Sequence, residues 1–266
     1  QLLYLGDEDI ITQAFGVQLK DHTCFLPGIV SRKKQVIPSL TALWGSFRNT
    51  EGEQVFTMRL FFIRHAEPDY EHDSLTEKGW REAELLARRT KNWKVDDFYM
   101  SPLGRAQATA SFTLKEHGKR AEVMDWLHEF RGELPEKDGG TRICWDLMPG
   151  TWTKQPQLLQ PEGWEAAPIL QGTNVKEEYD KAVAGFDEML TRYGYFRHGG
   201  YYESREHSDK CVVCFCHFGI TAVLLSHLWN VSPFITLHGT CLAPSSVTVL
   251  HTEEREPGIA YVRCQS

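Results

Sequence analysis

The stretch Phe61-Phe62-Ile63-Arg64-His65-Ala66-Glu67-Pro68 is an apolar run that ends abruptly in an arginine, a histidine and a turn-forming proline. Bulky apolar residues in succession are typical of a parallel strand that is buried on both faces. In open α/β sheets, ligands bind in the loops beyond the carboxyl ends of such strands. We therefore predict that this strand delivers His65 to a functional site, where its imidazole acts as a nucleophile.

Three further segments carry reactive or charged residues in a defined order along the chain. They are Ser101-Pro102-Leu103-Gly104-Arg105-Ala106-Gln107-Ala108-Thr109-Ala110, Leu127-His128-Glu129-Phe130 and Cys214-Phe215-Cys216-His217-Phe218-Gly219. Together with the Arg64-His65 pair, they resemble the histidine phosphatase superfamily, also called the phosphoglycerate mutase-like family. That family is marked by an Arg-His pair after the first strand, a Ser-Pro-Leu-x-Arg-Ala-x-x-Thr-Ala helix start, a mid-chain acid and a late His-x-Gly. The resemblance covers Met58 to about Arg263.

Two positions depart from the family's pattern. Ala66 stands where glycine is frequent, and Phe218 interrupts the frequent His-Gly-Gly. Alanine is a familiar variant at the first of these positions. We expect Phe218 to shape the pocket without removing a charge from it.

The resemblance implies an α/β fold, a three-layer sandwich with a mostly parallel central sheet flanked by helices. It also implies a metal-independent phosphomonoester hydrolase that forms a phosphohistidine on His65 and needs no cofactor. Covalent catalysis by histidine divides one difficult displacement into two easier ones. Arginine side chains suit a phosphate clamp, since a guanidinium binds phosphate oxygens in bidentate fashion. The residues expected to bind substrate are Arg64, Arg105, His217, Glu67 and Gly219.

Each titratable residue of this set needs a particular protonation state. His65 would attack phosphorus as a neutral imidazole, with its tautomer fixed by a hydrogen bond to a backbone carbonyl. His217 would be protonated, its pKa raised by the bound dianion. Glu129 would protonate the leaving alkoxide and later activate water, which requires a carboxyl pKa raised toward neutrality. Glu133 is the main rival for that role, and the family's Leu-x-Glu pattern favours Glu129.

Two other functions stay open beside hydrolysis. A phosphoglycerate-type mutase is the first, although the acidic Asp69 and Glu71 would disfavour a second phosphate near the nucleophile. A non-catalytic module that binds a phospho-ligand or a phosphoprotein is the second. Such a module would usually lack one member of the catalytic set, whereas this chain carries them all.

Three cysteines close to His217 raise the question of a metal site. On a strand, residues 214 and 216 share one face whereas 211 points to the other, and this is not the arrangement of a structural zinc site. We therefore expect these cysteines to be buried free thiols, and we expect no metal.

The composition of the chain argues against nucleic-acid and membrane partners. The formal net charge of −7 argues against a nucleic-acid-binding protein with a broad basic surface, because affinity for phosphate backbones comes chiefly from clustered Lys and Arg. Neither a signal peptide nor a run of about 18 apolar residues is recognisable, so we expect no membrane partner. Seven cysteines, an odd number, favour a reduced cytoplasmic setting. We expect a small-molecule phosphomonoester as partner, and the sequence leaves its identity and the oligomeric state open.

The chain divides at Met58, its first methionine. We expect residues 1–57 to be an N-terminal extension, with a non-native segment, a poorly ordered segment and a family-specific appendage left open, and the native protein to start at Met58. Residues 58–266 would form the histidine phosphatase domain, with a Trp-rich insertion at about 132–173 that caps the pocket. Local patterns predict that Ser101 caps a helix with Pro102 at its first position, and that Arg197–Lys210 is a polar loop. They further predict helices over 76–89, 175–192 and 220–229, and strands over 95–100, 121–124, 211–216, 246–250 and 259–263.

Overall fold

The computed structural model describes residues 57–136 and 139–265, so the predicted extension over residues 1–57 lies outside the described residues apart from Thr57. One large sheet is built from β1 (Arg59–Arg64), β4 (Asp97–Met100), β5 (Glu122–Val123), β8 (Tyr195–His198), β9 (Tyr201–Ser204), β10 (Cys211–Cys216), β11 (Val247–Glu256) and β12 (Ile259–Gln265). Its eight strands lie in the order β5-β4-β10-β1-β11-β12-β9-β8.

The half of the sheet that holds the predicted nucleophile is parallel. β1 pairs with β10, β10 with β4 and β4 with β5, all in parallel register. All six residues of β10 are buried, as are the central four of β1, which confirms the prediction of strands covered on both faces. Arg64 is in register with Cys216, so the residues that follow them, His65 and His217, emerge side by side at the carboxyl ends of the strands.

The other half of the sheet is antiparallel, from β11 through β12 and β9 to β8. The predicted polar loop over Arg197–Lys210 is wrong in its first part, because this segment contains the end of β8 and all of β9. The two strands form a hairpin that turns at Gly199, whose φ is +56°. Tyr195 and Tyr202 are nearly inaccessible and anchor the hairpin in the core, which outweighs the polar residues around them.

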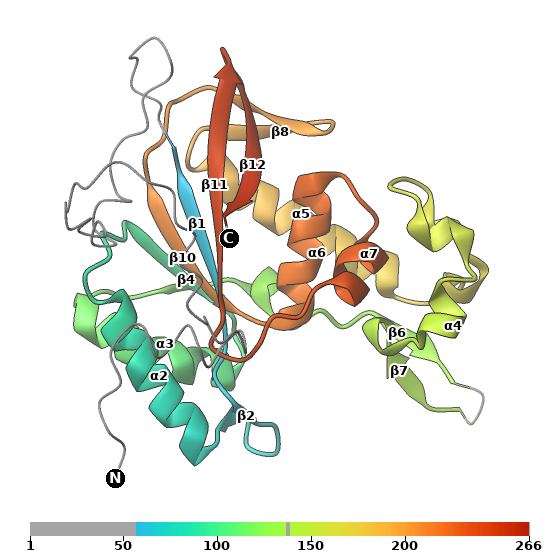
Figure 1. Ribbon diagram of the computed structural model, residues 1–266, viewed down its shortest axis with the longest axis horizontal. Coiled ribbons are helices and arrows are strands. Elements are labelled where there is room, and N and C mark those ends of the chain that lie inside the picture. Colours follow the sequence, from blue (N-terminus) through green and yellow to red (C-terminus); the bar gives the residue numbers. More distant parts are fainter. Residues whose placement is uncertain (1–56, 137–138, 266) are drawn as a thin grey trace, which may run out of the picture. The chain divides into compact units, whose positions relative to one another are not determined.

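Helices cover both faces of the sheet (Figure 1). Phe62 of β1 lies in a buried cluster with Phe186, whereas the neighbouring Phe61 packs on Trp93 with ring centroids 4.5 Å apart. Successive strand residues point to opposite faces, so each face has its own helical cover. The predicted three-layer α/β sandwich is thereby confirmed. Its helices are α2 (Glu77–Thr90), α3 (Gly104–His117), α5 (Val175–Thr191), α6 (Phe218–Trp229) and α7 (Pro233–Gly239).

Two helix starts were predicted from capping signals, with different outcomes. Thr76 caps α2 as expected, because its hydroxyl accepts the Gly79 N–H at 3.1 Å. Ser101 does not cap α3. That helix starts at Gly104, and Leu103 occupies the cap position without a side-chain hydrogen bond. The Ser101 hydroxyl instead accepts the N–H of Leu103, before the helix begins, and forms a hydrogen bond with His217.

The Trp-rich segment at about 132–173 is made of short elements. They are β6 (Glu133–Pro135), β7 (Thr141–Ile143), η3 (Cys144–Asp146), α4 (Pro149–Trp152), η4 (Pro156–Leu159), η5 (Trp164–Ala166) and η6 (Pro168–Leu170). Trp164 is 3% exposed and packs against Tyr179 and Phe234, and Trp152 stacks on His238. These two tryptophans therefore tie the segment to α5 and α7. That the segment caps the pocket stays a prediction.

The remaining short elements are β2 (Pro68–Asp69), β3 (Ser74–Leu75) and η2 (Asp125–Leu127), and β2 pairs with β3 after the nucleophile loop. Across the described ranges, none of the helices has the length and apolar character needed to cross a membrane.

Candidate active site

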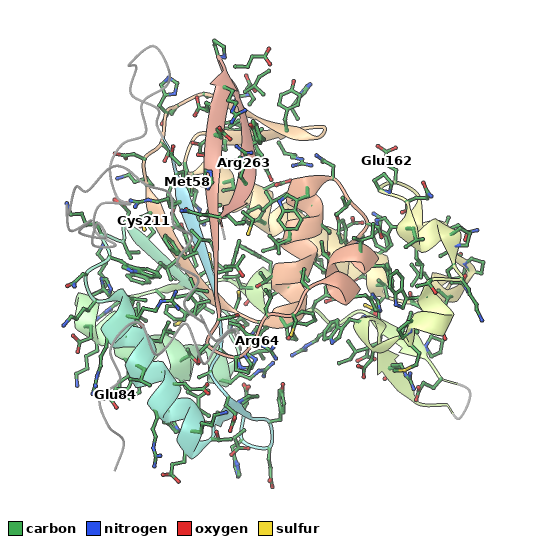
Figure 2. All side chains as sticks on the ribbon, in the orientation of Figure 1. Met58, Arg64, Glu84, Glu162, Cys211 and Arg263 are labelled. Carbon is green, nitrogen blue, oxygen red and sulfur yellow. The ribbon has the colours of Figure 1, made fainter. Side chains whose placement is uncertain are left out.

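His65 lies just beyond the carboxyl end of β1, at the end of the sheet marked by Arg64 in Figure 2. Its side chain is buried, and its Nδ1 lies 2.8 Å from the carbonyl oxygen of Ala66. Because a carbonyl only accepts hydrogen bonds, Nδ1 carries the hydrogen and Nε2 keeps its lone pair. Burial lowers the pKa of His65 to about 4, and the charges of Arg105 and Arg64 act in the same direction. The imidazole is therefore neutral near pH 7, as a nucleophile must be.

His217 faces His65, with the two ring centroids 5.0 Å apart. Its Nε2 lies 2.7 Å from Ser101 Oγ, whereas its buried Nδ1 has no hydrogen-bond partner within the described ranges. We assign the Ser101 hydroxyl as the donor to Nε2, which places the hydrogen of a neutral His217 on Nδ1. Burial, followed by Arg105 and His65, lowers the pKa of His217 to about 2. A protonated His217 thus stays a prediction for the phosphate-bound state.

Two arginines complete the cationic side of the site. Arg64 Nη1 donates to the carbonyl of Leu242, and Arg105 Nη1 donates to Asp73 Oδ1 at 2.7 Å. The Arg105 side chain is only 11% exposed. In both guanidinium groups Nε is buried, and the described part of the chain offers it no acceptor. Such donors are costly to bury unless an acceptor reaches them.

Glu129 reaches the start of α6 from the loop after η2. Its Oε1 accepts backbone N–H groups of Gly219 at 2.8 Å, Phe130 at 2.9 Å and Ile220 at 3.3 Å. Burial raises the pKa of Glu129 above its ordinary value, and this effect exceeds the opposing effect of the three N–H donors. Since Oε1 is occupied as an acceptor, a proton on this carboxyl resides on Oε2. That oxygen is the one suited to proton transfer.

The rival acid and the remaining predicted residues lie in different surroundings. Glu133 is exposed at the start of β6, where its backbone N–H donates to Asn174. Glu67 binds Thr76 and Lys78 through its carboxylate, so substrate binding by Glu67 stays a prediction. Gly219 lies directly against Glu129, because a Cβ there would be 2.8 Å from Oε1. Between the two acids, the geometry favours Glu129.

Three residues that support the site were not recognised from the sequence as functional. Thr109 donates to the Arg105 carbonyl at 2.8 Å and accepts the Ala66 N–H at 2.9 Å, which joins α3 to the nucleophile loop. Ser101 positions His217. Ser101 and Thr109 belong to the helix-start motif over residues 101–110, and that motif was the feature of the sequence that could have pointed to their roles. Asp73, which holds Arg105 and accepts the Gly104 N–H at 2.6 Å, comes from a loop position with no signal in the sequence.

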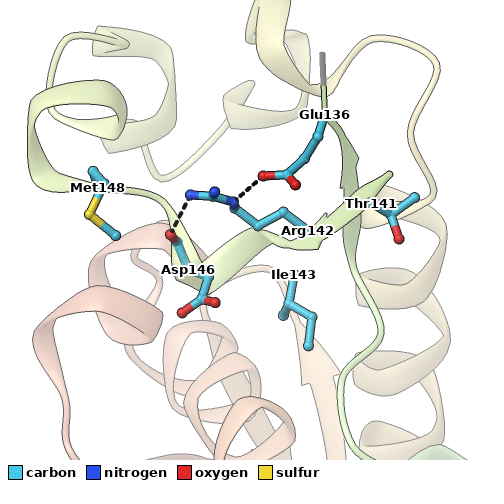
Figure 3. Close-up of a pocket in the computed structure, with 6 residues that line it drawn as sticks. All are labelled: Glu136, Thr141, Arg142, Ile143, Asp146 and Met148. Carbon is cyan, nitrogen blue, oxygen red and sulfur yellow. Dashed lines mark hydrogen bonds and ion pairs between the residues drawn. The ribbon is translucent and has the colours of Figure 1, made fainter. Parts of the chain in front are cut away.

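A separate hollow lies in the β6–β7 region and is lined by Glu136, Thr141, Arg142, Ile143, Asp146 and Met148 (Figure 3). Its arginine is already paired, because Arg142 Nε donates to Glu136 at 2.6 Å. This hollow therefore lacks the unpaired donors of the His65 site. Among residues 57–136 and 139–265, no cluster of three or more His, Cys, Asp or Glu is arranged to hold a metal ion.

The model of the histidine phosphatase superfamily (branch 1) matches residues 60–265. The chain belongs to this superfamily. A putative phosphoserine phosphatase 2 from Hydrogenobacter thermophilus is 26% identical over 221 residues, which are 77% of this chain and 94% of the relative. A mycobacterial glucosyl-3-phosphoglycerate phosphatase has a similar fold, with a TM-score of 0.54, 18% identity and coverage of 79% of this chain and 97% of that chain. A mutant phosphoserine phosphatase from Entamoeba histolytica, solved with phosphoserine, gives a TM-score of 0.52 at 18% identity and covers 79% of this chain and 95% of that chain.

The first part of the chain matches another family. Residues 1–43 match the model of the DHHA2 domain. A probable manganese-dependent inorganic pyrophosphatase from Staphylococcus carnosus is 57% identical over 42 residues, which are 15% of this chain and 14% of that protein. The chain thus spans a small fraction of that relative. The DHHA2 match ends before β1, so it includes none of the residues of the histidine phosphatase site.

We expect the histidine phosphatase fold to lose stability as the pH falls from 7 to 5. The pKa values of His65 and His217 in the folded chain, about 4 and about 2, lie below the ordinary 6.5. The unfolded chain therefore binds more protons than the folded chain below about pH 6.5, and acid favours unfolding. The two residues together should lower the free energy of unfolding by about 4 kcal/mol over this interval. Urea denaturation at pH 7, 6 and 5 measures the free energy of unfolding at each pH.

The control for this prediction is His217→Asn, which removes one of the two buried imidazoles. The slope of unfolding free energy against pH should be smaller in this variant than in the wild type, whatever its absolute stability. An unfolding free energy that stays constant or rises toward pH 5 in the wild type contradicts the prediction.

Proposed function

We propose that the chain is a metal-independent phosphomonoester hydrolase that forms a phosphohistidine on His65, with residues 58–266 as the catalytic domain. The observation that carries the proposal is a set of three buried nitrogen donors beside a neutral imidazole. Arg64 Nε, Arg105 Nε and His217 Nδ1 find no acceptor among the described residues. Phosphate oxygens are acceptors that suit such a set, and guanidinium groups bind them strongly.

The first chemical step follows from the lone pair on His65 Nε2. Nε2 attacks phosphorus, the bond from phosphorus to the ester oxygen breaks, and its electron pair goes to that oxygen. Glu129 Oε2 supplies the proton that makes the leaving group a neutral alcohol, a role supported by its raised pKa. Arg64, Arg105 and His217 stabilise the charge on the non-bridging oxygens.

The second step returns the enzyme to its starting state. Glu129, now ionised, accepts a proton from water, whose oxygen attacks phosphorus while the bond to Nε2 breaks. The products are the alcohol and inorganic phosphate. One carboxyl thereby acts first as acid and then as base, as microscopic reversibility of the two half-reactions requires.

Hydrolysis is favoured over transfer to a second position of the substrate by the loop after His65. Asp69 accepts hydrogen bonds from the Glu71 N–H and lies 2.8 Å from His72 Nδ1, so a carboxylate is held within this loop. An acidic loop disfavours a second phosphate there. The names of the relatives, phosphoserine and glucosyl-3-phosphoglycerate phosphatases, also support a phosphatase and a phosphorylated small molecule as substrate.

The test is steady hydrolysis of 4-nitrophenyl phosphate by the full chain with and without excess EDTA. We expect turnover with a rate that is unchanged by the chelator, because the proposed chemistry uses only side chains. Inorganic phosphate should inhibit competitively. Binding of phosphate with no turnover would instead support the non-catalytic module, and loss of turnover in EDTA would contradict the metal-independent mechanism.

A further inference from the structure

Two aromatic residues, Phe218 and Trp145, border the site on the side of Glu129. Together they are called the aromatic wall. Phe218 is the first residue of α6 and lies between His217 and Gly219 in the chain. Its ring centroid is 5.8 Å from Cζ of Arg64. Trp145 comes from η3, and its ring meets that of Phe218 at an interplanar angle of 79° with centroids 6.1 Å apart. Both side chains are half-buried.

The aromatic wall lies next to the proton donor. A Cβ on Gly219 would be 2.8 Å from Glu129 Oε1 and also 2.8 Å from Trp145 Cζ3. The carboxyl and the indole thus both border the space beside the Cα of Gly219. Because a general acid must come within hydrogen-bond reach of the leaving oxygen, the atoms bonded to that oxygen emerge beside the wall.

The wall is held in place before any substrate arrives. Trp145 packs on Phe130 with ring centroids 6.2 Å apart, and Phe130 is 1% exposed. A ring that already sits in its packed position loses little conformational entropy when a ligand covers it. Phe218 is likewise fixed at its backbone by the start of α6.

The chemistry of the wall discriminates between leaving groups. Phenyl and indole faces offer apolar surface and favourable edge-to-face or offset contacts to another ring. They offer no partner to a carboxylate, whose desolvation beside them and beside Glu129 is unfavourable. A leaving alcohol with an aromatic ring gains contacts here, whereas one with a carboxylate loses hydration.

We propose, on the basis of the phosphatase function above, that the aromatic wall selects phosphomonoesters whose leaving alcohol carries an aromatic ring. The ring lies against Phe218 and Trp145 while the phosphate occupies the Arg64 and Arg105 side. The reaction stays a hydrolysis in which one water converts the ester to the aromatic alcohol and inorganic phosphate. Phe218, the departure from His-Gly-Gly, is thereby a specificity-determining residue.

The test compares two primary alkyl phosphates of similar length, 3-phenylpropyl phosphate and 4-phosphonooxybutyrate. Their leaving alcohols have similar basicity, so Glu129 has the same task in both, and the ratio of their kcat/KM values reports the contacts of the remote group. We expect the wild type to favour the phenyl ester about tenfold or more, the range expected for an aromatic contact. Phe218→Ala and Trp145→Ala should each lower this ratio at least about threefold.

Trp152→Ala is the matched control, since Trp152 belongs to the same segment but stacks on His238. It should keep the wild-type ratio. Phe218→Leu retains apolar volume without a ring and should give an intermediate ratio, which provides a second variant if alanine at this position prevents folding.

The outcomes separate this inference from the proposed function. Hydrolysis of both esters at equal efficiency, or a preference for the carboxylate, overturns the inference and leaves the phosphatase standing. A wild-type preference that survives Phe218→Ala and Trp145→Ala also overturns it. Absence of turnover with both esters and with 4-nitrophenyl phosphate overturns the proposed function itself. A phenyl preference that falls in both wall variants and persists in Trp152→Ala supports the inference.

Discussion

We expect His65→Ala to lower kcat/KM for 4-nitrophenyl phosphate by about 10⁴-fold or more, because the variant has no atom that can accept the phosphoryl group. The ring of His65 lies 5.0 Å from that of His217, and the charges of Arg105 and Arg64 act on it. Alanine removes the nucleophile and leaves the cationic side of the site intact. Phosphate should therefore still bind to the variant, with an affinity near that of the wild type.

The measurement joins kinetics to direct detection of the intermediate. Wild-type protein mixed briefly with 4-nitrophenyl phosphate and quenched should carry a covalent phosphate that survives base and is lost in acid. The adduct should map to His65 and be absent from His65→Ala. His198→Ala, an exposed histidine in the β8–β9 hairpin, is the control that should keep both turnover and adduct. Substantial turnover by His65→Ala, or an adduct on another residue, contradicts the assignment.

We expect Glu129→Gln to lower kcat/KM for alkyl phosphates by about 10²- to 10⁴-fold, the usual range for loss of a general acid. Glutamine has nearly the same shape, and its amide oxygen can accept the N–H groups of Gly219, Phe130 and Ile220. The fold should therefore survive. What disappears is the proton for the leaving oxygen.

The dependence on leaving group distinguishes a catalytic role of Glu129 from a structural one. 4-Nitrophenolate leaves without protonation, so kcat/KM for its ester should fall by less than about tenfold. Because the same carboxyl activates water in the second step, the phosphoenzyme should accumulate in Glu129→Gln with this substrate. Glu133→Gln is the matched control and should behave like the wild type. Equal losses on alkyl and nitrophenyl esters, without accumulation, contradict the role.

Much of the fold was predictable because its central elements are strongly patterned. β10 spans the predicted residues 211–216, since an uninterrupted apolar run leaves little choice other than a buried strand. The α5 helix was found from its apolar periodicity, and α2 from its cap at Thr76. The β8–β9 hairpin was missed because its polar surface residues hide Tyr202, whose burial only the tertiary structure supplies.

The members of the candidate site that belong to motifs could be named from the sequence, whereas those that depend on contacts between distant residues could not. His65, Arg64 and Arg105 stood out because an Arg-His pair after a strand occurs together with an arginine in the Ser-Pro-Leu-x-Arg helix start. The partnership of Ser101 with His217 joins residues that are 116 positions apart and depends on the sheet register. Asp73 adopts a φ of +44°, a backbone choice that its sequence neighbours do not announce.

Asp73 also shows why electrostatics could not be derived in advance. Although burial raises the pKa of Asp73, the Gly104 N–H and the Arg105 guanidinium lower it below its ordinary value. That balance follows from distances of 2.6 Å and 2.7 Å that no local pattern specifies. The sequence led us to expect a charged His217 in the phosphate-bound state, and that stays a prediction. In the structure, burial, followed by Arg105 and His65, lowers the pKa of His217.

Three neighbouring strands of the parallel half of the sheet, β4, β10 and β1, hold the candidate site in place. His65, His217 and Ser101 each follow the last residue of one of these strands, and the His65 and Ser101 N–H groups donate to carbonyls of β10. Amides that are bonded to a buried strand tend to open at high free energies, close to that of global unfolding. We therefore expect these three residues to keep their places until the sheet opens, so that the activity we propose should be lost together with the fold.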